Sequence, residues 1–174
     1  AATLPEISLP DLASSLGTAR RPLPWRAATV ARSAAEAARG LASLQPSRCN
    51  PGVPRVAFLF TGQGAQWSGM GLDLLHHPAF AKALGRCAEI LDPMLGRHLH
   101  DLLGDKTALG STENTQPAIF AFEYATSQLW KSWGVVPEAV IGHSLGELVA
   151  ATVAGVWSLP DALALVVERG RLMG

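Results

Sequence analysis

The chain has 174 residues, of which 48% are hydrophobic, so it can bury a core as one domain, or one domain with a small appendage, and is not a disordered tail. Its 14 basic and 14 acidic residues cancel, which excludes a global field that favours nucleic acid or an anionic membrane, and no apolar run is long enough to span a bilayer. The two cysteines, Cys49 and Cys87, predict neither a disulfide scaffold nor a metal site and favour a reduced, cytoplasmic protein. Residues 1–10 lack the charged-then-apolar order of a signal peptide, so none is expected.

Residues 1–52 are predicted to form a small α/β unit of their own. A strand is expected over Trp25–Val30, between two helices that begin at Ser8 and Ser33. Each of these serines precedes an acidic residue at the third following position, a pattern typical of a capped helix start. The stretch Gln45–Pro54 holds three prolines, a glycine and an asparagine, which is typical of a linker. We therefore place a domain boundary at residue 52.

The body, residues 53–174, has the element order of an α/β fold. It opens with an apolar run, Arg55–Phe60, that predicts a parallel strand covered on both faces. Apolar residues then recur at helical spacing around Phe80–Leu91. A longer helix is expected from Ala118 to Trp133, with Pro117 in its first turn and Gly134 as its end. The next strand is expected over Val135–Ile141, and further helices begin at Leu145 and Ser158.

The most informative motif is the pentapeptide Gly142-His143-Ser144-Leu145-Gly146, which joins the second strand to its helix. A serine at such a turn presents its hydroxyl at the helix N-terminus, and the flanking glycines let the backbone pass. The motif predicts a nucleophile for acyl chemistry; the simpler alternative is a βα turn with a capping serine. His143 is expected to be structural, because adjacent side chains in such a turn point apart.

A glycine-rich loop, Thr61–Gly71, directly follows the first strand of the body. A dinucleotide-binding fingerprint fails because Trp67 stands where glycine is needed, and a phosphate loop fails because Met70 stands where lysine is needed. Such a loop can still present backbone N–H groups to a developing oxyanion, and the amide of Leu145 would supply a second donor.

Arg169 lies on the helix after the elbow helix, among the apolar neighbours Val166 and Val167. Most arginines are solvated surface residues. If this one is buried, its carboxylate partner would come from Glu168, from elsewhere in the fold or from a substrate.

Three separated motifs carry a family resemblance: FLFTGQGAQWSGMG from Phe58, GHSLGEL from Gly142 and ERGRLM from Glu168. In this order and spacing they resemble the malonyl-CoA:acyl carrier protein transacylase family. More narrowly, they resemble the acyltransferase domain of type I polyketide and fatty acid synthases. The resemblance covers roughly residues 55–174, and residues 1–52 resemble the linker subdomain between ketosynthase and acyltransferase. It implies a partial α/β-hydrolase-like parallel sheet with helices on both faces, beside a small N-terminal α/β subdomain.

The resemblance also implies roles for single residues. Ser144 would take an acyl group from coenzyme A and pass it to the phosphopantetheine thiol of an acyl carrier protein. The backbone amides of Gln63 and Leu145 would form the oxyanion hole, in a nucleophile elbow shaped by Gly142, His143 and Gly146. Arg169 would pair with the free carboxylate of a malonyl-type unit. The implied partners are malonyl-CoA, the carrier protein and an adjacent ketosynthase domain within a homodimeric synthase, with no permanently bound cofactor.

One departure limits the expected activity. The catalytic histidine of the family follows an inserted ferredoxin-like subdomain, and neither the insert nor that histidine is found in this chain. The histidines that are present match no family base: His76, His77, His98, His100 and His143. A serine without a base is a poor nucleophile, so the chain alone is expected to turn over little.

Two alternatives stay open. A serine hydrolase of thioesterase or lipase type uses the same elbow but discharges the acyl group to water; it has no need of Arg169 and normally carries an HGGG-type loop that is absent here. A truncated, non-catalytic fragment would have only a structural role.

Overall fold

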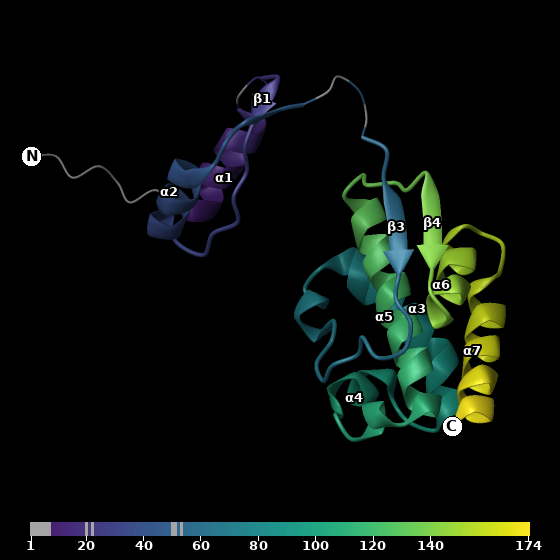
Figure 1. The fold of residues 1–174 in the computed structure, drawn as a ribbon. Helices are drawn as coiled ribbons and strands as arrows, with labels where there is room; N and C mark the ends of the chain where they lie inside the picture. Colours follow the sequence, from purple (N-terminus) through teal and green to yellow (C-terminus); the bar gives the residue numbers. More distant parts are fainter. Residues whose placement is uncertain (1–7, 20, 22, 50–51, 53) are drawn as a thin grey trace, which may run out of the picture. The chain divides into compact units, whose positions relative to one another are not determined.

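The computed structural model describes residues 8–19, 21, 23–49, 52 and 54–174. It divides into two compact units, Ala1–Pro54 and Arg55–Gly174 (Figure 1). Each unit is described by itself.

The first unit contains two capped helices, α1 (Leu9–Thr18) and α2 (Ala34–Ser43). The predicted caps are confirmed, because the hydroxyl oxygens of Ser8 and Ser33 accept the backbone N–H groups three residues further along the chain. No residue of either helix is buried, so among the described residues these helices contribute no core.

The strand of the first unit is shorter than the sequence predicts. β1 covers only Trp25–Arg26 and pairs antiparallel with β2, Ser47–Arg48. The predicted strand to Val30 was too long, because β2 offers only two residues for pairing. β2 was not predicted, since it lies among the prolines of the expected linker.

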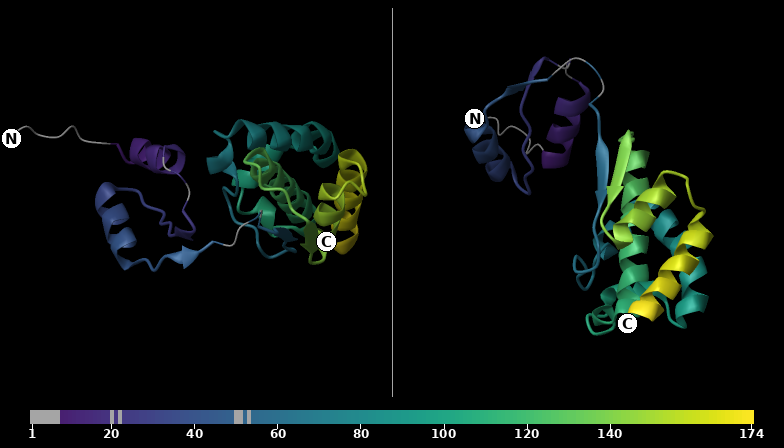
Figure 2. Two further views of the ribbon diagram at one scale, coloured as in Figure 1. Left: turned by 90° about the horizontal axis from the view of Figure 1, so that it is seen from above. Right: turned by 45° about the vertical axis from the view of Figure 1, so that its right-hand side comes forward.

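The second unit is built on two parallel strands, β3 (Ala57–Phe60) and β4 (Ala139–Gly142), which pair in register from Ala57↔Ala139 to Phe60↔Gly142. Around them lie α3 (Pro78–Leu95), α4 (Leu99–Gly104), α5 (Thr112–Ser132), α6 (Leu145–Val153) and α7 (Leu159–Met173), with 3-10 turns η1 (Leu72–Leu74) and η2 (Ala108–Gly110). The long helix α5 packs against both α3 and α7 (Figure 2). The predicted α/β order and parallel pairing are therefore present.

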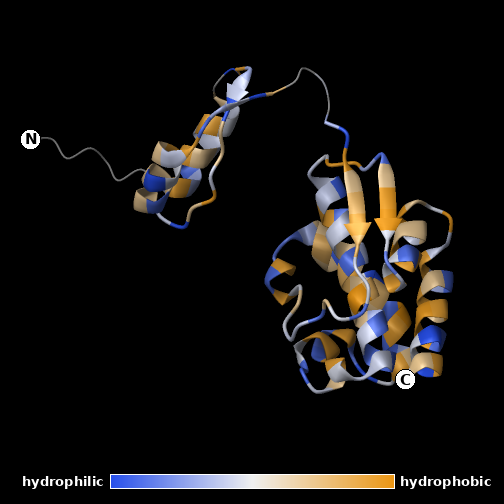
Figure 3. Cartoon of the chain, viewed as in Figure 1, coloured by the Kyte–Doolittle hydropathy of each residue, from blue (hydrophilic) through white to orange (hydrophobic). Residues whose placement is uncertain are grey.

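Among the described residues, helices cover only one face of the strand pair. Phe58, Phe60 and Val140 turn inward and pack on the core, while Leu59 and Ile141 are 73% and 60% exposed. Side chains alternate along a strand, so the apolar run that predicted cover on both faces places half of its side chains on a bare face. Figure 3 shows both strands in hydrophobic colours. The expectation of helices on both faces is not met among the described residues of this unit.

Helix α5 begins at Thr112, earlier than the predicted start at Ala118, and Pro117 lies inside it. The backbone of α7 supports this extra turn, because a Cβ added at Gly170 would lie 3.0 Å from the Cα of Glu113. The helix ends as predicted, with Gly134 in the left-handed region at φ 83°. Among the described helices, none is long and apolar enough to cross a membrane.

Candidate functional site

Ser144 lies in a strained turn between β4 and α6. Its backbone has φ 54° and ψ −110°, and it is the one non-glycine residue with positive φ in the described part of the chain. Such a conformation costs on the order of 1–3 kcal/mol and persists only when its surroundings impose it. Here two short-range bonds impose it: Gly146 N–H donates to His143 O at 2.9 Å, and Glu147 N–H donates to Ser144 O at 3.1 Å. The predicted strand-to-helix elbow is confirmed.

Two glycines make the elbow sterically possible. A Cβ on Gly142 would lie 2.0 Å from the carbonyl carbon of Gly146, and a Cβ on Gly146 would lie 2.4 Å from Phe60 O. The elbow therefore presses against the end of β3, where His143 N–H donates to Phe60 O at 3.1 Å. No side chain larger than hydrogen fits at either glycine without a backbone shift.

A chain of polar side chains connects Ser144 to the glycine loop. The Ser144 hydroxyl accepts a hydrogen bond from Nη2 of Arg169 at 2.9 Å, and Nη1 of Arg169 donates to Oε1 of Gln116 at 2.6 Å. Nε2 of Gln116 donates to Oε1 of Gln63 at 3.3 Å, and Nε2 of Gln63 donates to Thr112 Oγ1 at 3.3 Å. The fold thus brings together Ser144, Arg169 and Gln63, three residues singled out in the sequence.

Gln116 is the functional candidate that sequence reasoning missed. It is 0% exposed, and its amide links the guanidinium of Arg169 to the side chain of Gln63. The sequence placed it in a loop before the predicted helix start. The available signal was a glutamine flanked by residues that are all apolar from Pro117 to Phe122, because a buried amide requires hydrogen-bond partners.

The charge of Arg169 has only neutral partners. No ion pair of the described residues includes its guanidinium, and Glu168, one of its expected partners, instead lies 3.9 Å from Arg171. Arg169 is half-buried beside an exposed Ser144. A guanidinium with five donors and no ion-pair partner among the described residues has the capacity to bind an anion at this position.

None of the histidines, all of which lie in the described part of the chain, is hydrogen-bonded to Ser144. The rings of His76 and His77 are in contact at a tilt of 41°, and the ring of His77 meets that of Trp133 edge to face. His98 Nδ1 contacts Asp92 Oδ2 at 2.8 Å, and this hydrogen bond raises the pKa of His98. The ring of His143 lies over the glycine loop, since a Cβ on Gly62 would be 2.8 Å from its Nδ1. The His143 ring therefore lies against Gly62 and is not hydrogen-bonded to the Ser144 hydroxyl.

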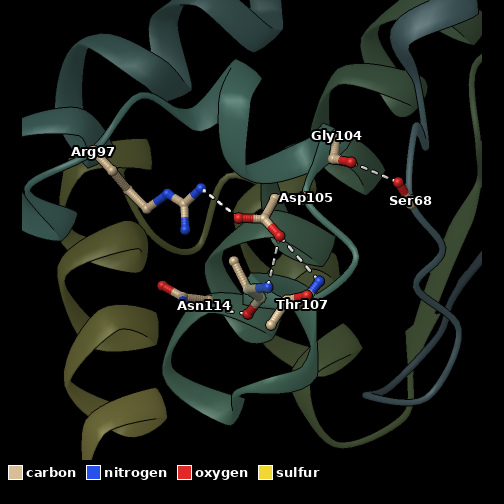
Figure 4. Close-up of polar contacts among 7 residues, drawn as sticks. Ser68, Arg97, Gly104, Asp105, Thr107 and Asn114 are labelled. Carbon is tan, nitrogen blue, oxygen red and sulfur yellow. Dashed lines mark hydrogen bonds and ion pairs between the residues drawn. The ribbon is translucent and has the colours of Figure 1, made fainter.

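The far end of the glycine loop is fixed to α4. Ser68 Oγ donates to Gly104 O at 2.6 Å, and Gly69 N–H donates to Leu103 O at 2.7 Å. Figure 4 shows that Gly104 directly precedes Asp105, whose carboxylate accepts the backbone N–H of Thr107 and contacts Arg97 at 3.2 Å.

Asp105 also accepts the backbone N–H of Ala108 at 3.0 Å. This bond, followed by the bond from Arg97, lowers the pKa of Asp105. The ionised carboxylate thereby holds in shape the turn on which the loop is fixed.

In the part of the chain that the structure describes, no group of three or more histidine, cysteine, aspartate or glutamate side chains is placed to hold a metal ion.

Comparisons with known proteins are consistent with this geometry. Residues 57–174 match the family described as "Acyl transferase domain". The chain is 45% identical over 179 aligned residues to the polyketide synthase GfsB of Streptomyces halstedii, covering 97% of this chain and 3% of GfsB. It is 40% identical to the erythronolide synthase EryA2 of Saccharopolyspora erythraea, covering 97% of this chain and 5% of EryA2.

Solved structures of acyltransferases are similar to this chain as well. The acyl transferase domain of ZmaA superposes with a TM-score of 0.87 at 36% identity, covering 97% of this chain and 42% of that one. The malonyl-CoA:ACP transacylase of Synechocystis sp. PCC 6803 superposes with a TM-score of 0.62 at 36% identity, covering 69% of this chain and 40% of that one. The chain therefore spans less than half of these solved domains and a few per cent of the curated relatives.

Proposed function

The chain belongs to the acyl transferase domain family, and we propose that it carries the nucleophile and the substrate carboxylate site of a polyketide synthase acyltransferase. The reaction is transfer of a malonyl-type unit from coenzyme A to the phosphopantetheine thiol of an acyl carrier protein. The observation that carries this proposal is the 2.9 Å contact between Arg169 and the Ser144 hydroxyl. It places an uncompensated cation beside the candidate nucleophile.

The transfer has two steps that share one covalent intermediate. The Ser144 oxygen attacks the thioester carbon of malonyl-CoA, the coenzyme A thiol leaves, and a malonyl ester remains on Ser144. The phosphopantetheine thiol then attacks that ester, which releases the serine hydroxyl. Each step passes through a tetrahedral oxyanion, for which we assign the backbone amides of Gln63 and Leu145 as donors. Leu145 is the first residue of α6, so its N–H has no partner within the helix.

The first step also needs an acceptor for the serine proton. No histidine of the described residues bonds to Ser144. We assign this role to the histidine of the family, in the portion of the relatives' acyltransferase domains that this chain does not cover. Until that group is supplied, slow acylation is the expected behaviour.

Arg169 gives the site its preference for a dicarboxylic acyl group. Gln116 holds Nη1 in place, and Nη2 points at the serine that carries the acyl group. The free carboxylate of a malonyl ester would accept from this guanidinium, whereas an acetyl group offers it nothing. A serine hydrolase of thioesterase or lipase type has no use for such a cation at its nucleophile, so the contact favours the transferase.

The remaining assignments follow from the family and its relatives. Coenzyme A thioester is a substrate, and no permanently bound cofactor is required. We assign residues 1–52 to the linker subdomain next to a ketosynthase and residues 53–174 to the N-terminal part of the acyltransferase domain, within a larger, homodimeric synthase.

Intact-protein mass spectrometry after exposure to malonyl-CoA or acetyl-CoA, with and without a carrier protein, tests the proposal. We expect a malonyl adduct that disappears in Ser144→Ala and moves to the carrier. Arg169→Ala should remove the preference for malonyl over acetyl, whereas Arg171→Ala, a control on the same helix that contacts Met94 O, should keep it. An adduct that water discharges faster than the carrier would support the hydrolase instead. If the chain forms an adduct neither alone nor with the complementary part of an acyltransferase, its role is structural.

A further inference from the structure

The start of the glycine loop is fixed by a buried carboxylate that the proposed mechanism does not use. Thr61, the first residue after β3, donates both its backbone N–H and its hydroxyl to Oε1 of Glu123, at 2.6 and 2.7 Å. Glu123 lies on α5 and is only 9% exposed. The backbone N–H of Thr61 is therefore bonded to a side chain of α5.

This arrangement is costly for the fold. The second oxygen of Glu123, Oε2, is buried without a hydrogen-bond partner, and no ion pair of the described residues includes this carboxylate. Glu123 lines a cavity together with the apolar side chains of Phe60 and Phe122. Burial raises the pKa of Glu123, against the opposing effect of the two bonds from Thr61. Because burying a carboxylate is unfavourable, an amide or an apolar side chain with a purely structural role at this position would cost the folded state less free energy.

Glu123 also lies on the same face of α5 as Gln116. The two are 123 − 116 = 7 positions apart, which is two turns of an α-helix and places both side chains on one face. Gln116 contacts the side chain of Gln63, and Glu123 holds the backbone two residues before it. One helix therefore hydrogen-bonds to the loop at two residues, Thr61 and Gln63, which flank Gly62.

We propose that Glu123 is a positioning residue that fixes the backbone of Thr61 so that the Gln63 amide stays aimed at the oxyanion formed on Ser144. This inference rests on the proposed function, because it assumes that the Gln63 amide is an oxyanion donor. The bond from Glu123 determines where the loop leaves β3, and Gly62 alone separates that point from Gln63. Loss of the bond frees the loop start while the Arg169 contacts stay intact. Substrate binding is then kept and the acylation step slows.

The first experiment measures single-turnover acylation of Ser144 by malonyl-CoA in a full acyltransferase domain that contains this chain. Glu123→Leu should lower the maximal acylation rate by about 10²-fold, the order of effect seen when one oxyanion donor is lost, with KM nearly unchanged. Glu123→Gln keeps an oxygen that accepts from Thr61 and should stay within a few-fold of the wild type. Ser127→Ala is the matched control, since Ser127 is 2% exposed on the same helix and bonds only within α5, to Tyr124 O and from Gln128.

Equal losses in Glu123→Leu and Ser127→Ala, or a loss confined to KM, would overturn the proposal. If Glu123→Leu fails to fold, Thr61→Val serves instead, because it removes only the hydroxyl bond to Oε1; its expected loss is smaller and again confined to the maximal rate.

A second readout is independent of the proposed function. In Glu123→Leu, hydrogen exchange should accelerate in the peptide containing residues 61–64 and not in the peptide containing residues 68–71. If the wild-type domain forms no malonyl adduct but Glu123→Leu shows this exchange pattern, the acyltransferase assignment is refuted and Glu123 remains the anchor of the loop. A normal adduct with unchanged exchange in Glu123→Leu would refute the role of Glu123 alone.

Discussion

The two turns that follow the parallel strands form the site in different ways. The turn after β4 is closed by bonds within itself, from Gly146 to His143 and from Glu147 to Ser144. The glycine loop after β3 is held from outside, by Glu123 at its start, by Gln116 in its middle and by Gly104 at its end. The elbow is therefore closed by its own bonds and packs on the end of β3, whereas the loop takes its shape from helices distant in sequence.

This difference has a mechanical consequence. A self-closed turn with no free space responds to substitution by steric conflict, which is large. A loop held by separate hydrogen bonds loses them one at a time, and each loss costs about 1 kcal/mol or somewhat more where a buried group is left unpaired. Substitutions in the two turns should therefore differ in size as well as in kind.

The largest effect is expected from Gly146→Ala, where the added Cβ would lie 2.4 Å from Phe60 O. Relief of this conflict requires β3 and the elbow to separate, so we expect a destabilisation above about 4 kcal/mol and loss of the Ser144 adduct. Urea denaturation measures the first and mass spectrometry the second. Gly85→Ala is the control: Gly85 lies in α3 with no atom within 4 Å of an added Cβ, and alanine there should stabilise by up to about 1 kcal/mol. A tolerated Gly146→Ala would show that the elbow does not pack closely against the end of β3.

The next effect is expected from Gln116→Leu. This change removes the hydrogen-bond partner of Nη1 of the half-buried Arg169 and of Oε1 of the exposed Gln63, and the loss of these bonds, one of them to a charged group, costs about 1–3 kcal/mol. We also expect weaker discrimination between malonyl-CoA and acetyl-CoA, measured by competitive labelling of Ser144. Gln128→Leu on the same helix removes only a bond to Ser127 and should leave both quantities nearly unchanged. Equal effects of the two variants would mean that Gln116 does not organise the site.

A third prediction concerns pH. Burial raises the pKa of Glu123 above its ordinary value of 4.5, so the folded protein holds this proton more tightly than the unfolded chain does. The contribution of Glu123 to stability is therefore full below pH 4.5 and is lost as the pH rises through the raised pKa. Denaturant titrations at a series of pH values should show this slope in the wild type and a flatter one in Glu123→Gln.

Asp105 provides the opposite sign for comparison. Its pKa is lowered, first by the Ala108 N–H, so its contribution is present at neutral pH and is lost on acidification through the lowered pKa. Asp105→Asn should flatten only that acidic part of the curve. If Glu123→Gln left the pH dependence of the free energy of unfolding above pH 4.5 unchanged, ionisation of Glu123 would not be the cause of the slope.

The smallest effect is expected from Ser68→Ala at the far end of the loop. It removes one exposed hydrogen bond to Gly104 O, worth about 0.5–1.5 kcal/mol, while Gly69 N–H still holds Leu103 O. Acylation of Ser144 should change far less than in Glu123→Leu. A larger loss of rate in Ser68→Ala than in Glu123→Leu would move the anchor of the loop from α5 to α4.

The sequence predicted the local features well. The serine caps at Ser8 and Ser33, the helix start at Ser158, the helix end at Gly134 and the strand-to-helix turn at Ser144 all depend on residues close together in the chain, and the structure contains each of them. Short-range sterics and hydrogen bonding decide such features, so a few neighbouring residues suffice to predict them.

Features that depend on distant partners were predicted less well. β1 is limited by the two residues of β2. α5 begins at Thr112, where its first turn packs closely on Gly170 of α7. The expected cover on both faces of the strand pair also failed, since a run of apolar residues does not reveal which face other elements cover.

The sequence by itself predicted the strand-to-helix turn at Ser144, because a serine between glycines after an apolar strand is typical of such a turn. It also predicted Gln63 and Arg169 as candidate site residues. Only the tertiary structure decided that α5 joins them: Gln116 bridges their side chains, and Glu123 holds the loop start through Thr61. A buried polar side chain is recognised by the partners it finds, and those partners come from β3, α5 and α7, which the fold alone brings together.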